Sequence, residues 1–195
     1  FLSEKGTLGD AFKEELEARR IPYEEGRHSR ERLFAADEIV KSPGIPDQLP
    51  LIRELREAGL PVISEIEFAG RYTDATLIGI TGSNGKTTTT KLTHHLLQAA
   101  GIDAGMAGNV GISFARALTR APHAHYVLEL SSFQLDGIEA FRPQIAALLN
   151  ITPDHLDRYD YQMANYIRSK FRIIRNQEPG DVFLYNEDND NVAGY

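Results

Sequence analysis

The strongest chemical signal in the chain is a glycine-rich segment at residues 81–87, with the sequence Thr-Gly-Ser-Asn-Gly-Lys-Thr. It lies between a run typical of a strand and a run typical of a helix. Phosphate binds well there, because glycines let backbone N–H groups approach, the helix N-terminus favours an anion and lysine adds charge. The common P-loop pattern has a glycine where Ile80 stands. The context still favours a nucleotide phosphate site over a plain glycine-rich turn.

A carboxylate, Glu129, lies near the end of an apolar run at residues 125–130. Burying a carboxylate is costly unless a partner compensates for it. The carboxyl ends of neighbouring parallel strands face one ligand site, so Glu129 is predicted to bind Mg²⁺ beside the phosphates. The alternative is a glutamate at the sheet edge that points to water.

Residues 150–159, with the sequence Asn-Ile-Thr-Pro-Asp-His-Leu-Asp-Arg-Tyr, form a polar segment directly after another apolar run. Ligands bind where parallel strands end. His155 could ligate a metal or contact phosphate there, while Asp154 and Asp157 add negative charge. A solvated turn is the open alternative.

Lys170 occupies an unusual position for a lysine. At about 100° per residue it lies in the middle of an apolar helical stripe, formed by Met163, Tyr166, Ile167, Phe171 and Ile174. A lysine in such a stripe either extends its charged end to water or acts chemically in a partly desolvated place.

Alternating strands and helices must position these residues. Strands are predicted at residues 38–40, 61–64, 76–80, 125–130, 144–151 and 181–185, and helices at 8–20, 47–58, 86–100 and 161–175. Such alternation, with nearly continuous apolar strands, is typical of a parallel sheet covered on both faces. We predict an α/β fold with a first domain at residues 1–72 and a P-loop parallel-sheet domain at 73–195.

The composition limits the class of protein. The 195 residues include no cysteine, which excludes disulfides and thiolate metal sites. A net charge of −7 argues against a general nucleic-acid-binding surface. No apolar run reaches about 18 residues and no signal pattern is present, so we expect no membrane span and a cytoplasmic protein. The two ends of the sequence indicate a piece of a longer enzyme.

Together these motifs resemble those of the Mur ligase family. The segment 81–87 is shared by the whole family and by the related folylpolyglutamate synthases. Residues 108–111 (Gly-Asn-Val-Gly), 128–135 (Leu-Glu-Leu-Ser-Ser-Phe-Gln-Leu) and 154–159 are similar to the branch that adds D-glutamate. Residues 42–44, Ser-Pro-Gly, resemble the UDP-sugar loop of that branch. The resemblance covers essentially the whole chain.

The resemblance implies an ATP-dependent acid–amino-acid ligase that uses two Mg²⁺ ions. Its catalytic residues would be Lys86 on the ATP phosphates, Thr87 with Glu129 on the first Mg²⁺, and His155 on the second Mg²⁺, bridged by a carbamylated Lys170. The nucleotide-binding residues would be Gly82, Ser83, Asn84, Gly85, Lys86, Thr87 and Thr88. The substrate-binding residues would be Ser3, Glu4, Lys5, Ser42, Pro43, Gly44, Asn109, Ser131 and Gln134.

The resemblance also implies the substrates UDP-N-acetylmuramoyl-L-alanine and D-glutamate, an acyl-phosphate intermediate, and a monomer without a nucleic-acid or membrane partner. Residues 1–72 would be a Rossmann-like UDP-substrate domain truncated at its N-terminus. Residues 73–195 would be a central ATP-binding domain truncated at its C-terminus, so we expect this chain alone to be inactive.

Two alternatives stay open at this stage. One is a ligase for another amino acid, or a folylpolyglutamate synthase; the Ser-Ser-Phe-Gln at residues 131–134 disfavours both. The other is a P-loop nucleotide switch or binding module without ligation, which would not need a UDP-binding N-terminal unit.

Overall fold

The computed structural model describes all residues from Phe1 to Tyr195, and the chain divides into two compact units. The first comprises Phe1–Ile39 and Pro50–Pro61, and the second comprises Val40–Leu49 and Val62–Tyr195. Parallel strands alternate with helices, so the predicted α/β class is confirmed. The compact units do not define functional domains, and the boundary near residue 72 stays a prediction. No helix is both long and apolar enough to cross a bilayer.

The first unit contains short elements with few buried side chains. They are β1 (Leu2–Ser3), α1 (Asp10–Ala18), β2 (Tyr23–Glu24), α2 (Arg30–Phe34) and α3 (Pro50–Glu57). β1 and β2 pair in parallel. The amphipathic helix α3 buries Ile52 and Leu55. It begins at Pro50, later than predicted, because a proline is well tolerated at the first helical position, where its missing N–H has no partner to lose.

The second unit is built on five parallel strands in the order β6-β7-β5-β8-β9. They are β5 (Thr76–Thr81), β6 (Ala104–Gly108), β7 (His125–Glu129), β8 (Ile145–Leu148) and β9 (Val182–Tyr185). The central strand β5 pairs with β7 on one side and with β8 on the other. After β5 the chain adds β6 and β7 on one side of it, and then β8 and β9 on the other side. The carboxyl ends of β5, β7 and β8 therefore lie at a topological switch point, where ligands bind in such sheets.

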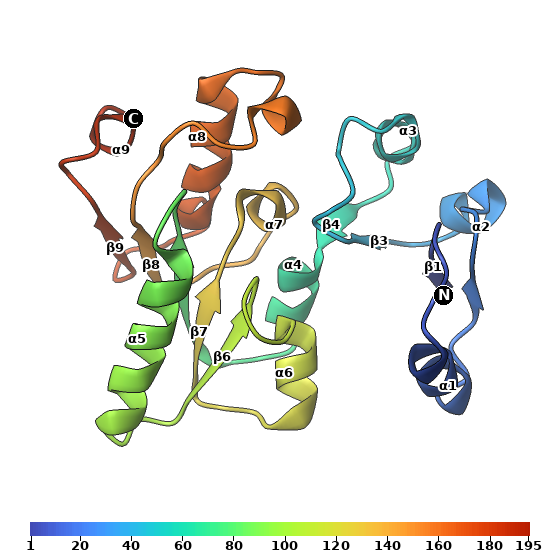
Figure 1. The fold of residues 1–195 in the computed structure, drawn as a ribbon, viewed down its shortest axis with the longest axis horizontal. Helices are drawn as coiled ribbons and strands as arrows, with labels where there is room; N and C mark the ends of the chain where they lie inside the picture. The colour runs from blue at the N-terminus through green and yellow to red at the C-terminus, as the bar shows by residue number, and fades with distance from the viewer. The chain divides into compact units, whose positions relative to one another are not determined.

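Helices pack on and around this sheet (Figure 1). They are α4 (Glu65–Gly70), α5 (Lys86–Ala99), α6 (Phe114–Arg120), α7 (Ser132–Asp136), α8 (Met163–Phe171) and α9 (Asp190–Ala193), with the 3₁₀ turns η1 (Leu156–Tyr159) and η2 (Arg172–Ile174). α5 packs against β5, β6 and β7, whereas α7 packs against α8. A separate two-stranded sheet joins β3 (Ile39–Lys41) to β4 (Val62–Ser64).

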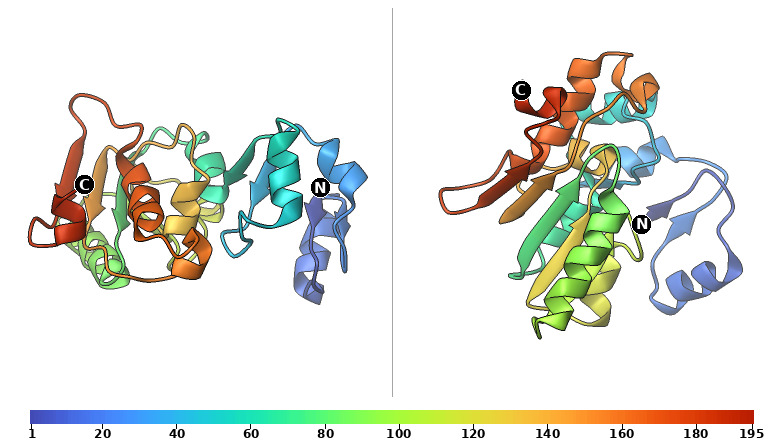
Figure 2. Two further views of the ribbon diagram at one scale, coloured as in Figure 1. Left: turned by 90° about the horizontal axis from the view of Figure 1, so that it is seen from above. Right: turned by 60° about the vertical axis from the view of Figure 1, so that its left-hand side comes forward.

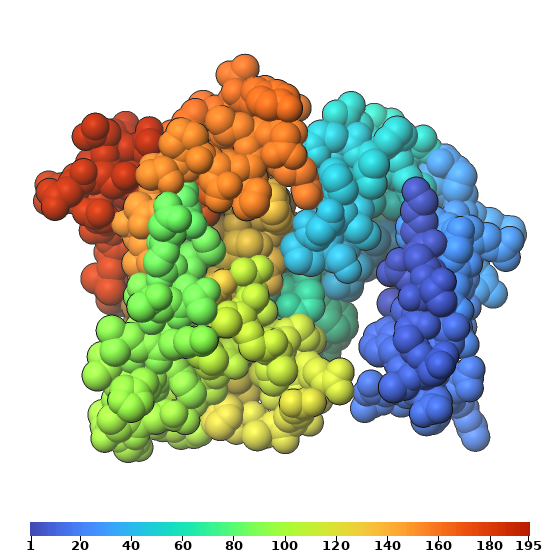
Figure 3. Space-filling view, viewed as in Figure 1, coloured from blue at the N-terminus to red at the C-terminus, as the bar shows by residue number.

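The carboxyl ends of the strands are covered by α8 and the segment that precedes it. Figure 1 and the right-hand view of Figure 2 show α8 and this segment beyond the carboxyl end of β8. In the space-filling view the same residues, near 150–170 in orange, lie above α5 (Figure 3). The polar segment predicted from the sequence therefore lies at the carboxyl ends of the parallel strands.

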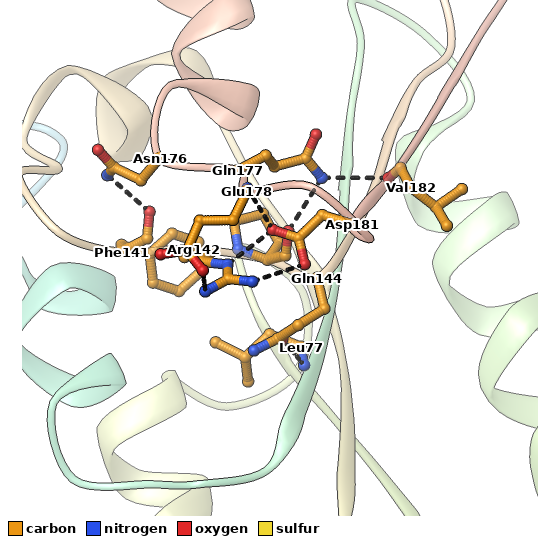
Figure 4. Close-up of polar contacts among 10 residues, drawn as sticks. Leu77, Phe141, Arg142, Gln144, Asn176, Gln177, Glu178, Asp181 and Val182 are labelled. Atoms are coloured by element: carbon orange, nitrogen blue, oxygen red, sulfur yellow. Dashed lines mark hydrogen bonds and ion pairs between the residues drawn. The ribbon is translucent and has the colours of Figure 1, made fainter.

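At the opposite end, polar side chains hold the edge strand β9 (Figure 4). Arg142 donates to both carboxylate oxygens of Asp181, at 2.6 and 2.9 Å, and its third nitrogen lies 2.6 Å from Glu178. Gln144 accepts a hydrogen bond of 2.8 Å from the Leu77 N–H. These contacts connect the segments around β5, β8 and β9 at the end remote from the predicted site.

Candidate active site

The glycine-rich segment forms a tight loop between β5 and α5. Gly85 has a φ of +83°, a left-handed conformation that glycine adopts readily, and the helix begins at the next residue. A side chain at Gly82 would approach the Leu149 side chain to 3.1 Å and the Asn150 backbone to 3.4 Å. Glycine therefore lets the loop lie against the segment after β8 while the free N–H groups of α5 remain available to an anion.

Two polar residues of this loop bind the segment at residues 150–152. The Ser83 hydroxyl donates to the Thr152 carbonyl and accepts from the Thr152 N–H, both at 3.0 Å. The Asn84 N–H donates to the Asn150 side chain at 2.9 Å. These bonds fix the phosphate loop relative to the polar segment that follows β8.

Two lysines converge on one backbone carbonyl of the loop. Lys86 Nζ donates to the Gly82 and Ser83 carbonyls, both at 2.9 Å, and Lys170 Nζ donates to the Gly82 carbonyl at 2.8 Å. Lys170 is 2% exposed, so it does not extend to water. Burial lowers the pKa of Lys170 to about 7, and the positive charge of Lys86 adds to this effect against the opposite influence of Asp154 and Asp136.

Glu129 is buried at the end of β7, with 2% of its surface exposed. Its carboxylate accepts hydrogen bonds from the Thr87 hydroxyl at 2.6 Å and from the Asn109 side chain at 2.7 Å. Asn109 follows Gly108, which has a φ of +105° and at which a Cβ would lie 2.3 Å from the Glu129 carbonyl. The alternative of a glutamate that points to water is therefore wrong.

The donor set at Thr87 and Glu129 fits Mg²⁺ bound together with a nucleotide. Carboxylate and hydroxyl oxygens suit this hard cation, which commonly keeps several waters and takes its remaining ligands from substrate phosphates. No group of three or more histidine, cysteine, aspartate or glutamate side chains is arranged to hold a metal ion. The geometry thus fits a shared metal–phosphate site rather than a cage made by the protein alone.

His155 lies on the loop after β8, with a side chain that is 54% exposed. Its Nε2 atom is 3.5 Å from the Asp154 carboxylate, and its ring centroid is 5.1 Å from that of Phe133. It makes no hydrogen bond to Glu129 or Lys170. Thus Thr87 and Glu129, predicted for the first Mg²⁺, share a hydrogen bond, whereas His155 and Lys170, predicted for the second, do not.

Ser131 and Gln134 form a capping box at the start of α7. The Gln134 N–H donates to the Ser131 hydroxyl at 3.2 Å, and the Gln134 side chain accepts from the Ser131 N–H at 2.9 Å. These reciprocal bonds satisfy donors at the helix start. They give both residues a structural role, and their predicted contact with substrate stays a prediction.

Known proteins are similar to this chain in sequence and in fold. The Mur ligase middle domain family matches residues 80–194. The chain belongs to the Mur ligase family. A second family, the MurD N-terminal domain, matches residues 1–49 of this Mur ligase.

Two curated relatives carry the name UDP-N-acetylmuramoylalanine–D-glutamate ligase. The protein of Christiangramia forsetii is 54% identical over 195 residues, which are 100% of this chain and 44% of that protein. The protein of Bacteroides fragilis is 57% identical over 185 residues, which are 95% of this chain and 42% of that protein. This Mur ligase chain therefore spans less than half the length of these relatives.

Solved Mur ligases share the fold. The UDP-N-acetylmuramate:L-alanyl-gamma-D-glutamyl-meso-diaminopimelate ligase from Neisseria meningitides aligns with a TM-score of 0.64 at 19% identity, over 99% of this chain and 65% of its own. A Thermotoga maritima MurF ligase in complex with ADP aligns with a TM-score of 0.53 at 16% identity, over 83% of this chain and 48% of its own. These likenesses confirm the Rossmann-like and P-loop architecture.

The predicted N-terminal substrate residues of this Mur ligase lie in the first unit. The Ser3 hydroxyl bonds to the Glu24 carboxylate at 2.8 Å and to His28 Nδ1 at 2.7 Å. Hydrogen bonds from the Ser29 side chain and backbone lower the pKa of Glu24 to about 2. Glu4 accepts from the Gly6 N–H at 2.6 Å, and Lys5 is exposed. Glu24 and His28 lie in no recognisable motif, so the sequence did not indicate these contacts with Ser3.

The predicted UDP-sugar turn at residues 42–44 follows β3 and belongs to the second unit. The Pro43 and Gly44 carbonyls face the Arg158 guanidinium at 3.4 and 3.5 Å. Arg158 was not among the predicted site residues, although it stands in the motif that also contains His155. An arginine among exposed polar residues carries no distinctive signal in the sequence.

Proposed function

We propose that the full-length protein is an ATP-dependent amide ligase of peptidoglycan precursor synthesis that adds D-glutamate to UDP-N-acetylmuramoyl-L-alanine. The observation that carries the proposal is the buried carboxylate of Glu129. It is held by Thr87 of the nucleotide loop and by Asn109, which is predicted to contact the muramoyl substrate. A carboxylate in this place suits a reaction in which a metal–nucleotide and a second substrate meet. The names of the relatives at 54% and 57% identity support the same assignment.

The nucleotide would be ATP, held by Gly82–Thr88. Lys86 now donates to two loop carbonyls, and its charge is free of any carboxylate partner, so it can turn to the phosphates. Thr87 and Glu129 would hold the first Mg²⁺, which neutralises phosphate charge when bound. Most of the catalytic effect would come from positioning and from charges placed in advance.

The reaction would proceed in two covalent steps. A carboxylate oxygen of the muramoyl-alanine substrate attacks the γ-phosphorus of ATP, and the bond to the departing ADP breaks. The amine of D-glutamate then attacks the carbonyl carbon of the acyl phosphate. The tetrahedral intermediate expels phosphate, the amine nitrogen loses its proton, and the amide remains. Lys86 would stabilise the negative charge on the transferred phosphoryl group.

Lys170 would be carbamylated in the working enzyme. A neutral amine adds CO₂ and loses a proton, which gives an anionic carbamate. The pKa of about 7 supports this proposal, because part of the Lys170 population is then neutral near pH 7. With His155, the carbamate would hold a second Mg²⁺. The lone ammonium beside Lys86 is electrostatically unfavourable, and the modification would remove that repulsion.

The two parts of the chain would bind different substrates. Residues 1–72 would bind the UDP-substrate and residues 73–195 would bind ATP. The contacts to the UDP-substrate would come from Ser3, Glu4, Lys5, Ser42, Pro43, Gly44, Asn109, Ser131 and Gln134. The enzyme would act as a cytoplasmic monomer.

A phosphate-release assay on the full-length protein tests this function. Release should require ATP, Mg²⁺, UDP-N-acetylmuramoyl-L-alanine and D-glutamate together, and L-alanine or L-lysine in place of D-glutamate should give little signal. Release that is independent of the muramoyl substrate would instead identify a nucleotide switch or a simple ATPase.

A further inference from the structure

Arg158 carries a half-buried positive charge that no carboxylate neutralises. Its guanidinium lies over the Phe133 ring, 4.3 Å from the centroid. Its hydrogen-bond acceptors are the carbonyls of Pro43 and Gly44, at 3.4 and 3.5 Å. Arginine often stacks on aromatic rings in this way, because its flat guanidinium keeps N–H donors available at its edge.

The backbone of Arg158 is bound to the same segment as its side chain. The Gln48 side chain donates to the Arg158 carbonyl. Arg158 and residues 43–48 are 110 or more positions apart in the sequence, yet both belong to the second unit. The side-chain and backbone contacts of Arg158 together fix the loop that contains it relative to residues 43–48. A single hydrogen bond would not fix two loops in this way.

The aromatic ring beneath Arg158 is part of a firm support. Phe133 stacks at 6.0 Å and 11° on Tyr159. The Tyr159 hydroxyl donates to Asp136 at 2.9 Å and lies 3.1 Å from the buried Ser169 hydroxyl. The support therefore extends from α7 to α8, the helix that carries Lys170. Arg158 connects this packed region to an exposed turn.

We propose that Arg158 is a positioning residue that holds the turn at residues 42–44 in place for the UDP-sugar substrate. The proposal rests on the proposed ligase function. It predicts a selective effect, because none of the groups that hold the nucleotide loop contacts Arg158: Ser83 and Asn84 bond to residues 150–152, and Thr87 bonds to Glu129. Loss of Arg158 should loosen the turn and leave the ATP site intact.

The first test compares Michaelis constants in the full-length enzyme. Arg158→Ala should raise the KM for UDP-N-acetylmuramoyl-L-alanine about tenfold, the effect of losing hydrogen bonds from a charged donor, and leave the KM for ATP within about twofold. Arg158→Lys should restore little, because an ammonium neither stacks flat on Phe133 nor reaches two carbonyls at once. Arg168→Ala, at an exposed arginine of α8, is the matched control and should change neither constant.

The second test observes the turn directly. Hydrogen exchange of a peptide covering residues 41–49 should become faster in Arg158→Ala and in Phe133→Leu, whereas exchange of α5 should not change. This comparison also shows whether each variant remains folded. Equal changes in both KM values, or unchanged exchange at residues 41–49 in a folded Arg158→Ala protein, would overturn the proposal. If the wild-type protein does not ligate D-glutamate, the proposed ligase function itself fails. That result comes from the wild type alone and does not depend on the Arg158 variants.

Discussion

The ammonium group of Lys170 lies against a backbone carbonyl in a buried place, beside the charge of Lys86. The sequence predicted an unusual lysine here because Lys170 interrupts an apolar stripe. The structure adds what the stripe could not show, namely that the partner is Gly82 of the phosphate loop. The buried side chain of Lys170 is thus in direct contact with the predicted phosphate loop.

The depressed pKa of Lys170 predicts a pH dependence of stability. The folded-state pKa of about 7 lies below the ordinary value of 10.5. Between these two values the unfolded chain binds more protons, so this residue makes the free energy of unfolding rise with pH. Lys170→Met removes that contribution. The free energy of unfolding is measured by urea titration of the full-length protein in CO₂-free buffer. The wild-type value minus the Lys170→Met value should increase by about 2 kcal/mol from pH 7 to pH 9. A difference that does not vary with pH would contradict the burial of a titrating amine.

Residues in recognisable motifs were predictable from the sequence, and residues that act through tertiary contacts were not. Glu129 stands out in the sequence as a carboxylate in an apolar strand, and the structure buries it. Arg158 stands among polar neighbours, and Glu67, a buried glutamate, lies in the 6-residue helix α4, so no local pattern marks either residue. The three backbone N–H groups that donate to Glu67 lie 72 or more positions away along the chain, and the turn bound by the Arg158 guanidinium lies 114 or more positions away.

At the scale of elements, α4 holds the connection between α7 and β8 through one side chain. Glu67 is 1% exposed, and one of its carboxylate oxygens accepts N–H bonds from three successive residues, at 2.9, 3.0 and 2.7 Å. Those residues are Glu139, Ala140 and Phe141. Without this carboxylate the three N–H groups would lose a shared acceptor, and the N–H of buried Phe141 would be costly to leave without a partner.

Glu67→Gln should therefore destabilise the protein by about 2–3 kcal/mol, since the amide retains the shape but accepts less strongly and brings donors toward other donors. A lower urea midpoint for the full-length protein would show this effect. Glu187→Gln, at an exposed glutamate, supplies the matched control and should leave the midpoint unchanged. A midpoint for Glu67→Gln equal to that of the control would show that α4 does not support the connection.

Long periodic elements were predicted well, and short ones near the site were missed. The helix expected at residues 86–100 is α5 (Lys86–Ala99), and the strand expected at 76–80 is β5. β6 has the sequence Ala-Gly-Met-Ala-Gly, which lacks the branched and aromatic residues that mark strands. α7 has 5 residues, too few for a helical period. β6 therefore depends on tertiary packing, whereas α7 is marked in the sequence only by the Ser131–Gln134 capping box at its start.

At the scale of the whole molecule, the parallel sheet brings distant segments to one end. Alternation of strands and helices predicted such a sheet, but not that β7 lies between β5 and β6. That order places Asn109 against Glu129, and so connects the nucleotide loop to the segment that is predicted to contact the muramoyl substrate. Strand order depends on crossovers that a single sequence does not encode locally.

The central claim is that this end of the sheet serves a ligase that forms an acyl phosphate. The most direct measurement uses UDP-N-acetylmuramoyl-L-alanine labelled with ¹⁸O in both carboxylate oxygens, incubated with the full-length enzyme, ATP, Mg²⁺ and D-glutamate. If the carboxylate attacks the γ-phosphorus and the amine later expels phosphate, each released phosphate should carry one ¹⁸O atom, and the amide should retain the other. Mass spectrometry distinguishes the labelled phosphate. Unlabelled phosphate, released in step with amide formation, would contradict the account.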